Sequence, residues 1–391
     1  MSSQTKNSNA PDVLVIGGGL IGCAIALRLA QARLAVCVID RGDPGKEASS
    51  AAAGMLAPQG EMVEPGAFFQ LCMASRRLYP SFAAEVEELS GEKVGYRGDG
   101  NLLVAINQEE CQELENTYRA QAPLGLPLER LSAEEVTKCV PGLSTEIRCG
   151  LFVSGDHWVD NERLTEALVK ACRRLDVSFI TGSAVTRLER EGDRVVSLQV
   201  APQSGGAGDV TTVAADRFVL AAGCWSNALV APLGVPLPMV PCRGQMIEFE
   251  SPQDFPLVVR RSTHYLVPRA QRRIVAGTTT EYVGFEKAVT GEGLRSILEG
   301  AMRITPLVKQ LRFRRAWSGL RPDTADHLPI LGYGELDNLL FATGHFRNGI
   351  LLAPITAQLI SELLLAGSTS RPIEVYRPTR FARISSDSLT R

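Results

Sequence analysis

The sequence has few histidines and no marked excess of charge of either sign. Only four histidines occur in 391 residues, and none forms an obvious catalytic pair. The net charge at pH 7 is -2, from 41 basic and 43 acidic side chains. Because nucleic acids and anionic membranes select basic surfaces, this balance gives no reason to expect either as a partner.

Paired cysteines are also absent. The nine cysteines are an odd number scattered along the chain, and no two form a C-x-x-C pair. This spacing argues against a metal site or a dithiol redox motif. Cys23 and Cys37 lie in apolar runs, where a thiol acts as a small core side chain. We therefore expect no metal, reduced cysteines and a cytoplasmic location.

Long unbroken hydrophobic runs are missing as well. Residues 1–11 are polar and lack the hydrophobic stretch of a signal peptide, so we expect a flexible tail there and another at residues 380–391. The run at residues 13–29 is broken by four glycines. We identify no other stretch long enough to span a bilayer.

The chain opens with the pattern of a βαβ unit. Residues 13–16 are typical of a buried strand, residues 21–32 of a helix, and residues 35–39 of a second strand. This order implies a parallel sheet with helices on its faces. A similar strand-then-helix pattern occurs at residues 339–342 and 350–365. In residues 244–280, by contrast, the sequence pattern is that of antiparallel strands.

The sequence GGGLIG at residues 17–22 stands between the first strand and the first helix. Gly17 permits a tight turn, Gly19 lets the backbone approach a pyrophosphate, and Gly22 allows close packing of helix and strand. The N-terminus of the helix offers free N–H groups to phosphates. The alternative is an ordinary glycine-rich turn, but the full context favours nucleotide binding.

Asp40 ends the second strand, where a carboxylate accepts hydrogen bonds from ribose hydroxyls. Arg41 follows it and complicates this interpretation, because an arginine also serves a 2′-phosphate. These residues do not distinguish NAD from FAD. The small residues at 49–56 (SSAAAGML) could begin a helix capped by Ser49 or Ser50, or provide a flat backbone surface for a ring system. Their position after Asp40 favours the longer FAD.

Three later segments could complete a site. Residues 218–226 read as a buried strand that runs into a glycine turn, which could close over a nucleotide. Residues 344–352 (GHFRNGILL) open the last helix, and a helix N-terminus suits the negative charge of a reduced flavin. The alternative for this segment is a loop with Asn348 as the N-cap.

Arg321 lies between an apolar strand and a proline, and it could hold a substrate carboxylate through two hydrogen bonds. A surface salt bridge is an equally good interpretation on this evidence. Residues 264–269 alternate in a strand pattern, so Tyr265 could point into a cleft while His264 points away. The alternative is a core tyrosine.

The chain resembles the glycine oxidases, within the D-amino-acid oxidase and sarcosine oxidase-like family of flavoproteins. The resemblance runs from about residue 12 to about residue 375, and its most specific parts are SAAAGML at 50–56, GLRP at 319–322 and GHFRNGILLAP at 344–354. It implies an α/β fold in which a Rossmann-type FAD-binding domain is interleaved with an antiparallel-sheet substrate-binding domain. We expect the first domain at residues 12–80, 150–235 and 320–375, and the second at 81–149 and 236–319.

The resemblance also implies roles for individual residues. Arg321, Arg347 and Tyr265 match the residues that bind and orient the substrate. The expected FAD-binding residues include the glycines of the first turn. They are Gly17, Gly19, Leu20, Ile21, Gly22, Asp40, Arg41, Ala48, Ser49, Ala53, Gly54, Met55, Val185, His345, Phe346, Arg347, Asn348, Gly349, Ile350 and Leu351.

Two departures from the family pattern bear on the substrate. Thr263 stands where a histidine is expected, and Arg260 and Arg261 replace an aromatic–histidine pair. Family members with covalent flavin use a cysteine late in the chain, whereas no cysteine here follows Cys242. The resemblance therefore implies FAD held without a covalent bond.

The expected activity is oxidative deamination of glycine, sarcosine or small D-amino acids, with hydride transfer to flavin N5. Oxygen is reduced to hydrogen peroxide, and glyoxylate and ammonia are released. The family also implies a homotetramer and a role in thiamine thiazole synthesis. The alternatives are an NAD-dependent dehydrogenase, an FAD-binding subunit without activity of its own, and an oxidase or dehydrogenase that is not specific for glycine.

Overall fold

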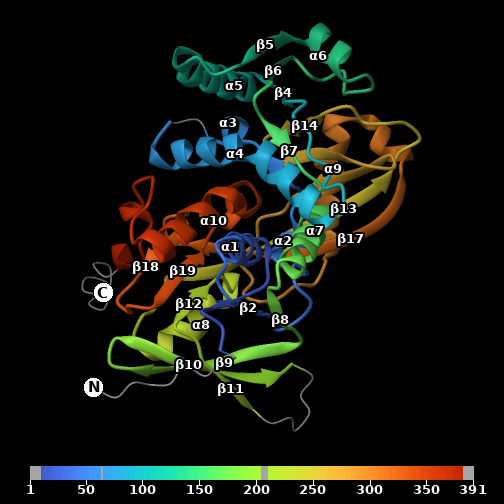
Figure 1. The fold of residues 1–391 in the computed structure, drawn as a ribbon. Helices are drawn as coiled ribbons and strands as arrows, with labels where there is room; N and C mark the ends of the chain where they lie inside the picture. The colour runs from blue at the N-terminus through green and yellow to red at the C-terminus, as the bar shows by residue number, and fades with distance from the viewer. Residues whose placement is uncertain (1–9, 63–64, 204–209, 382–391) are drawn as a thin grey trace, which may run out of the picture.

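The computed structural model describes residues 10–62, 65–203 and 210–381 of the chain (Figure 1). Of the predicted tails at residues 1–11 and 380–391, residues 1–9 and 382–391 lie outside the described residues. The expected strands and helices are present.

A six-stranded sheet forms one half of the molecule, and its strand order is β18-β19-β12-β1-β2-β8. All neighbours in this sheet are parallel except β18, which is antiparallel to β19. The sheet therefore joins segments from the beginning, middle and end of the chain. Its strands are β1 (Val13–Ile16), β2 (Val36–Ile39), β8 (Ser178–Ile180), β12 (Arg217–Leu220), β18 (Ile330–Tyr333) and β19 (Leu339–Thr343).

Alternate residues of the central strand enter two different cores. Val13 and Val15 pack against the helices on one face. Leu14 and Ile16 pack on the opposite face. Because both faces are covered, the strand is apolar throughout, as a parallel strand requires. Each fully buried aliphatic side chain contributes about 1.5–3 kcal/mol relative to an exposed one.

Helices α1 (Leu20–Gln31), α4 (Ala67–Ser90), α7 (Asn161–Arg174) and α10 (Gly349–Ala366) pack together on the first face. The second face is covered by a three-stranded antiparallel sheet of β9 (Ser183–Glu191), β10 (Arg194–Pro202) and β11 (Thr211–Val213) (Figure 1). Within this sheet β9 and β10 pair as an antiparallel hairpin.

An eight-stranded sheet forms the other half, in the order β17-β13-β16-β15-β14-β4-β6-β5. Its neighbours are antiparallel except for the β14–β4 pair. Its strands are β4 (Asn101–Ala105), β5 (Glu129–Ser132), β6 (Cys149–Val153), β13 (Met239–Glu250), β14 (Val258–Arg261), β15 (His264–Arg269), β16 (Arg273–Gly277) and β17 (Arg312–Thr324).

The two faces of this sheet have different partners. Helix α9 (Gly291–Ile304) covers one face, where Ile297 packs with Ile247 and Leu266. The other face carries Met246 and Tyr265, which pack with Ala53 from the first half of the molecule. Because successive side chains of a strand point to opposite faces, each strand contributes one set of residues to the core under α9 and another to the face directed toward the six-stranded sheet.

The remaining elements are short or peripheral. They are α2 (Ala48–Ala51), α3 (Pro58–Glu61), α5 (Gln108–Gln121), α6 (Ala133–Cys139), α8 (Ser226–Val230), the paired strands β3 (Met55–Leu56) and β7 (His157–Trp158), and the 3-10 helices η1 (Ala122–Leu124), η2 (Gly223–Trp225), η3 (Ala231–Leu233), η4 (Pro306–Gln310), η5 (Phe346–Asn348), η6 (Glu374–Tyr376) and η7 (Pro378–Phe381).

Three expectations need correction. The predicted domain boundaries at residues 80, 149 and 319 fall inside α4, β6 and β17, because each of these elements runs on without a break. The predicted flexible tail began at residue 380, but Arg380 forms an ion pair with Asp326 at 2.7 Å and Phe381 is buried. The division into two domains itself stays a prediction.

The third correction concerns the last helix. Residues 346–366 are long and apolar enough to cross a bilayer, contrary to the sequence analysis. Within the fold, however, 72% of its apolar 18-residue window is buried. Its apolar surface packs against α1 and α4, which is the behaviour of a core helix.

Candidate active site

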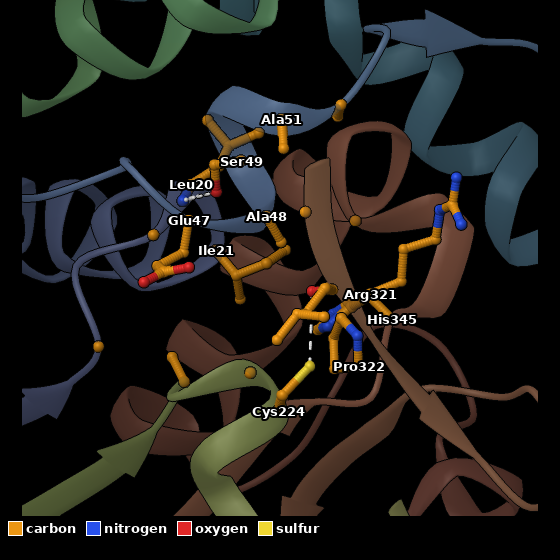
Figure 2. A pocket seen from close by; sticks show the side chains of 18 of the residues that line it. Leu20, Ile21, Glu47, Ala48, Ser49, Ala51, Cys224, Arg321, Pro322 and His345 are labelled. Atoms are coloured by element: carbon orange, nitrogen blue, oxygen red, sulfur yellow. Dashed lines mark hydrogen bonds between the residues drawn. The ribbon is translucent and has the colours of Figure 1, made fainter. Parts of the chain in front are cut away.

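A cavity of about 450 Å³ lies between the two halves of the molecule. It is lined by the turn after β1, by the segment around α2, by β13, β15 and β17, and by the start of α10. Figure 2 shows Leu20 and Ile21, the α2 segment, Cys224, Arg321 and His345 around it. Of the predicted site residues, those that line it are Gly17, Gly19, Leu20, Ile21, Asp40, Arg41, Ala48, Ser49, Ala53, Gly54, Met55, Val185, Tyr265, Arg321, His345, Phe346, Arg347, Asn348, Gly349 and Ile350.

Two predicted residues do not line this cavity. Gly22 lies behind the turn, where a Cβ atom would overlap the carbonyl oxygen of Gly17. It therefore performs the packing function expected of the third glycine. Leu351 is buried, and its carbonyl oxygen accepts a hydrogen bond from Ser75 Oγ at 2.6 Å. Leu351 is thus a core residue of α10 rather than a cavity residue.

The first glycine turn has little space for side chains. Gly17 has a φ of +105°, and a Cβ atom there would lie 2.5 Å from the carbonyl oxygen of Ala221. Gly19 is the N-cap of α1 and makes no side-chain capping bond. The Ser49 hydroxyl instead accepts a hydrogen bond from Leu20 N at 2.9 Å (Figure 2). The predicted cap of α2 by Ser49 or Ser50 is therefore wrong, since α2 has Glu47 at its N-cap and no side-chain bond there.

Asp40 holds the turn from the end of β2. Its two carboxylate oxygens accept hydrogen bonds from Gly18 N at 2.7 Å and Gly42 N at 2.8 Å. Burial raises the pKa of this carboxyl, and the two backbone N–H groups oppose that shift. The carboxylate lines the cavity and keeps lone pairs that could accept a ribose hydroxyl.

Arg41 has partners that the sequence analysis did not identify. Its guanidinium lies 3.5 Å from the ring centroid of Trp225 and pairs with Glu47 at 2.5 Å. Glu47 also pairs with Lys287 at 2.7 Å. Because the charge of Arg41 is already matched by a carboxylate, a 2′-phosphate is a poor fit here. Glu47 belongs to no sequence motif, so its position beside the cavity could be found only from the fold.

The start of α10 is open toward the cavity. Asn348 makes no side-chain capping bond, so the predicted alternative of an Asn348 cap is wrong. Unpaired N–H groups at a helix N-terminus favour an anionic or electron-rich ligand. His345 lies beside them, with Nε2 3.0 Å from Thr356 Oγ1. Burial lowers the pKa of His345 to about 3, so this ring stays neutral.

These features fit FAD. Two helix N-termini whose own N-cap residues make no side-chain bond, those of α1 and α10, border one cavity. Between them lies a wall of small residues in which a Cβ atom at Gly54 would overlap the carbonyl oxygen of Val159. The first helix would face the pyrophosphate, and the second would face the flavin. Cys224 also lines the cavity, but burial raises its thiol pKa to about 12, which disfavours the reactive thiolate.

Arg321 lies at the end of the cavity formed by the eight-stranded sheet. Its guanidinium donates to Thr278 Oγ1 at 2.8 Å and to the carbonyl oxygen of Thr279 at 3.1 Å. Within residues 10–62, 65–203 and 210–381 no carboxylate forms an ion pair with it, so the surface salt bridge is not observed. The charge of Arg321 is therefore available to a ligand (Figure 2).

Tyr265 points into the same end of the cavity, whereas His264 lies on the other face of β15 against Gly300 of α9. This alternation is the predicted one. The Tyr265 hydroxyl lies 3.5 Å from Met246 Sδ. Burial raises the pKa of Tyr265, and the nearby charges of Arg321 and Arg347 oppose that effect.

Arg347 approaches a carboxylate that the sequence analysis missed. Its Nη2 lies 3.9 Å from Glu61 Oε1, and the Arg347 side chain is 30% exposed. Glu61 belongs to α3, which is fixed by the buried Asp156 through bonds from Gln59 N and Gly60 N. Glu61 follows the small-residue segment directly, but nothing in its local sequence signals a site.

The residues that depart from the family pattern lie at different depths. Thr263 is exposed in the turn between β14 and β15, outside the cavity lining. Arg261 pairs with Glu110 at 2.6 Å. Arg260 donates to the carbonyl oxygen of Gly60 at 3.0 Å and lies 3.7 Å from Glu61 Oε1. Of the three, Arg260 lies nearest the cavity, because it contacts Glu61, which lines it.

No group of three potential metal ligands occurs within the part of the chain that the structure describes. All nine cysteines are free.

Comparison with known proteins agrees with this site. Residues 12–363 match the model of the family described as FAD dependent oxidoreductase. A glycine oxidase of Geobacillus kaustophilus is 32% identical, over 94% of this chain and 97% of that protein. The crystal structure of glycine oxidase from this organism superposes with a TM-score of 0.89 at 31% identity, covering 95% of this chain and 99% of that one.

The bifunctional protein ThiO/ThiG of Synechocystis is 38% identical over 95% of this chain. That protein is longer, and the match covers 54% of it. The chain thus spans about half the length of its bifunctional relatives. The match over residues 12–363, together with the cavity described above, shows that the chain belongs to the family of FAD dependent oxidoreductases.

Proposed function

We propose that this chain binds FAD without a covalent bond and oxidises glycine, sarcosine or small D-amino acids, using oxygen as the acceptor. The observation that carries the proposal is the position of Arg321, which lines the cavity of about 450 Å³ without a carboxylate partner among the described residues. The similarity to glycine oxidase over almost the whole chain supports glycine as a substrate. The predicted site residues are proposed to act as follows.

Arg321 would bind the substrate carboxylate through two parallel hydrogen bonds. Thr278 and the carbonyl oxygen of Thr279 already hold its guanidinium, so little side-chain freedom is lost when the substrate binds. The Tyr265 hydroxyl lies beside it and would donate to the same carboxylate. Together these groups would fix the orientation of the substrate Cα.

FAD, when bound, would supply the two-electron acceptor for the hydride of the substrate Cα and pass the electrons to oxygen. The protein then needs orientation more than a strong base. His345 remains neutral and is hydrogen-bonded to Thr356, so it adds no charge beside the flavin site. The substrate would react with its amine deprotonated, and the imine formed from glycine would hydrolyse to glyoxylate and ammonia.

The resemblance to glycine oxidases and to ThiO/ThiG extends the proposal to a supply of imine for thiamine thiazole synthesis. The free cysteines support a location in the reducing cytoplasm. The homotetramer remains a prediction from the resemblance, which size-exclusion chromatography with light scattering would test.

A substrate panel tests the proposal. The purified yellow protein is given glycine, sarcosine, small D-amino acids and the corresponding L-amino acids, and peroxide is measured. We expect peroxide with at least one of the first three groups. If the flavin is present and reduced by the amines but no peroxide forms, the chain is a dehydrogenase subunit instead.

A further inference from the structure

The substrate end of the cavity contains more positive than negative charge. Arg321, Arg347 and Glu61 line the cavity together with Tyr265, and Arg260, which is outside this lining, lies 3.7 Å from Glu61 Oε1. Arg260 and Tyr265 are directly opposite each other on β14 and β15, so their side chains share one face of the sheet. The excess charge is therefore a property of this face of the eight-stranded sheet.

Glu61 is shared between two arginines at long distance. Its Oε1 lies 3.7 Å from Arg260 Nη1 and 3.9 Å from Arg347 Nη2. A charge-assisted hydrogen bond is typically about 2.7–2.9 Å long, so neither contact is a close pair. One carboxylate thus offsets two guanidinium groups incompletely.

The two arginines differ in what else holds them. Arg260 also donates to the carbonyl oxygens of Gly60 and Ser262, and its side chain is 16% exposed. Arg347 lines the cavity, its side chain is 30% exposed, and among the described residues Glu61 is its one ion-pair partner. Arg260 is consequently fixed in the wall, whereas Arg347 can receive a ligand.

A substrate with one carboxylate leaves this charge unmatched. The carboxylate of glycine would bind Arg321, and Arg347 would keep only its 3.9 Å contact with Glu61. A second anionic group on the substrate would complete the charge balance at Arg347. In this arrangement Arg260 has a positioning role, because it draws Glu61 away from Arg347.

We propose that the preferred substrates are small amino acids with a second carboxylate, which binds Arg347 while the first binds Arg321, and that Arg260 makes this possible by holding Glu61. The inference rests on the proposed function, since it names the substrate class of the same site. Glycine remains a substrate, oxidised with a lower kcat/KM.

Two pairs of amines test the inference on the purified holoenzyme. Iminodiacetate is sarcosine with an added carboxylate, and D-aspartate is D-alanine with an added carboxylate. We expect kcat/KM to be about tenfold or more higher for the dicarboxylate of at least one pair, the change that ~1.4 kcal/mol produces. A higher kcat/KM for iminodiacetate would mean that the second carboxylate is attached through the nitrogen. A higher kcat/KM for D-aspartate would mean that it is attached through Cα. The ratio of kcat/KM within that pair should fall as salt is added, because salt screens the interaction between the second carboxylate and Arg347.

Binding of non-oxidisable analogues separates this inference from the oxidase proposal. Oxydiacetate and methoxyacetate stand in for iminodiacetate and sarcosine, and succinate and propionate stand in for D-aspartate and D-alanine. Calorimetry gives the Kd of each analogue. If no amine is oxidised but a dicarboxylate binds about tenfold more tightly, the oxidase proposal fails and the second anion site stands. If amines are oxidised but neither dicarboxylate is preferred in kcat/KM or in Kd, the second anion site is wrong.

Variants test the role of Arg260 through opposite effects. Arg260→Gln should reduce the preference for the dicarboxylate, because Glu61 then pairs with Arg347, and Arg260→Lys should restore part of it. Glu61→Gln should increase the preference. Arg261→Gln is the matched control, since Arg261 pairs with Glu110 away from the cavity. If the preference for the dicarboxylate changes in the same direction in Arg260→Gln and Glu61→Gln, or in neither variant, Arg260 has no positioning role. If Arg260→Gln does not fold, Glu61→Gln alone is the test: an increased preference supports the role, and an unchanged or reduced preference contradicts it.

Discussion

Gly244 on β13 and Arg321 on β17 depend on each other. A Cβ atom at Gly244 would occupy the space of the Arg321 guanidinium, which lies across the strand in contact with Thr278. The absence of a side chain at residue 244 therefore sets the position of the cation that we propose binds the substrate carboxylate. No motif in the sequence links these two residues.

Gly244→Ala should displace the Arg321 guanidinium and weaken substrate binding while FAD stays bound. We expect KM for glycine to rise by about tenfold or more, because a misdirected charge-assisted hydrogen bond costs about 1.5–3 kcal/mol. Steady-state peroxide assays measure this effect. Gly291→Ala is the control, since a Cβ atom there meets nothing within 4 Å. An unchanged KM in Gly244→Ala would show that Arg321 tolerates displacement.

Arg321→Ala should remove the carboxylate contact itself. We expect KM for glycine to rise about 10- to 100-fold, again from a loss of about 1.5–3 kcal/mol, with little change in the Kd for FAD. Kinetics and flavin titration of the apoprotein measure the two quantities. Arg312→Ala, at a side chain that is 83% exposed, is the control. Normal glycine kinetics in Arg321→Ala would remove Arg321 from the mechanism.

Asn161→Ala should weaken FAD binding. Asn161 Nδ2 donates to the carbonyl oxygens of Ser49 at 2.8 Å and Ser50 at 3.1 Å, and its Oδ1 accepts from Arg269 at 2.9 Å. Because two carbonyl oxygens lose this donor and the buried Arg269 keeps only its backbone acceptors such as Ala53 O, the local structure should be destabilised by about 1–3 kcal/mol. Flavin titration should show a higher Kd, whereas Asn116→Ala on the exposed face of α5 should leave it unchanged. A normal Kd in Asn161→Ala would mean that α2 is positioned by other contacts.

His345→Gln should change how stability depends on pH. In the folded protein burial lowers the pKa of His345 to about 3, well below its value in the unfolded chain. The unfolded state therefore binds a proton that the folded state does not, and stability is lost as pH falls below about 6.5. Between about pH 7 and pH 5 this loss should be about 2 kcal/mol for the wild type and absent from the variant. Urea unfolding at both pH values, with saturating FAD, measures the difference; identical pH dependence would show that His345 titrates normally.

The sequence was sufficient to predict the first βαβ unit, because its strands are buried on both faces and its glycines have fixed spacing. It also predicted the alternation of His264 and Tyr265, since a strand directs neighbouring side chains to opposite faces. It could not predict Glu47, Glu61 or the Trp225–Arg41 contact, because these depend on loops that meet only in the folded chain. Asn348 was a plausible cap by residue type, yet its side chain makes no capping bond.

The most direct measurement is anaerobic mixing of the purified protein with glycine, followed by absorbance spectroscopy and then by admission of oxygen. If the turn at Gly17 and the start of α10 enclose one FAD beside Arg321, the protein is yellow, glycine bleaches the flavin band, and oxygen restores it with formation of peroxide. A colourless protein that cannot be reconstituted with FAD, or a flavin band that no small amino acid bleaches, would contradict this account.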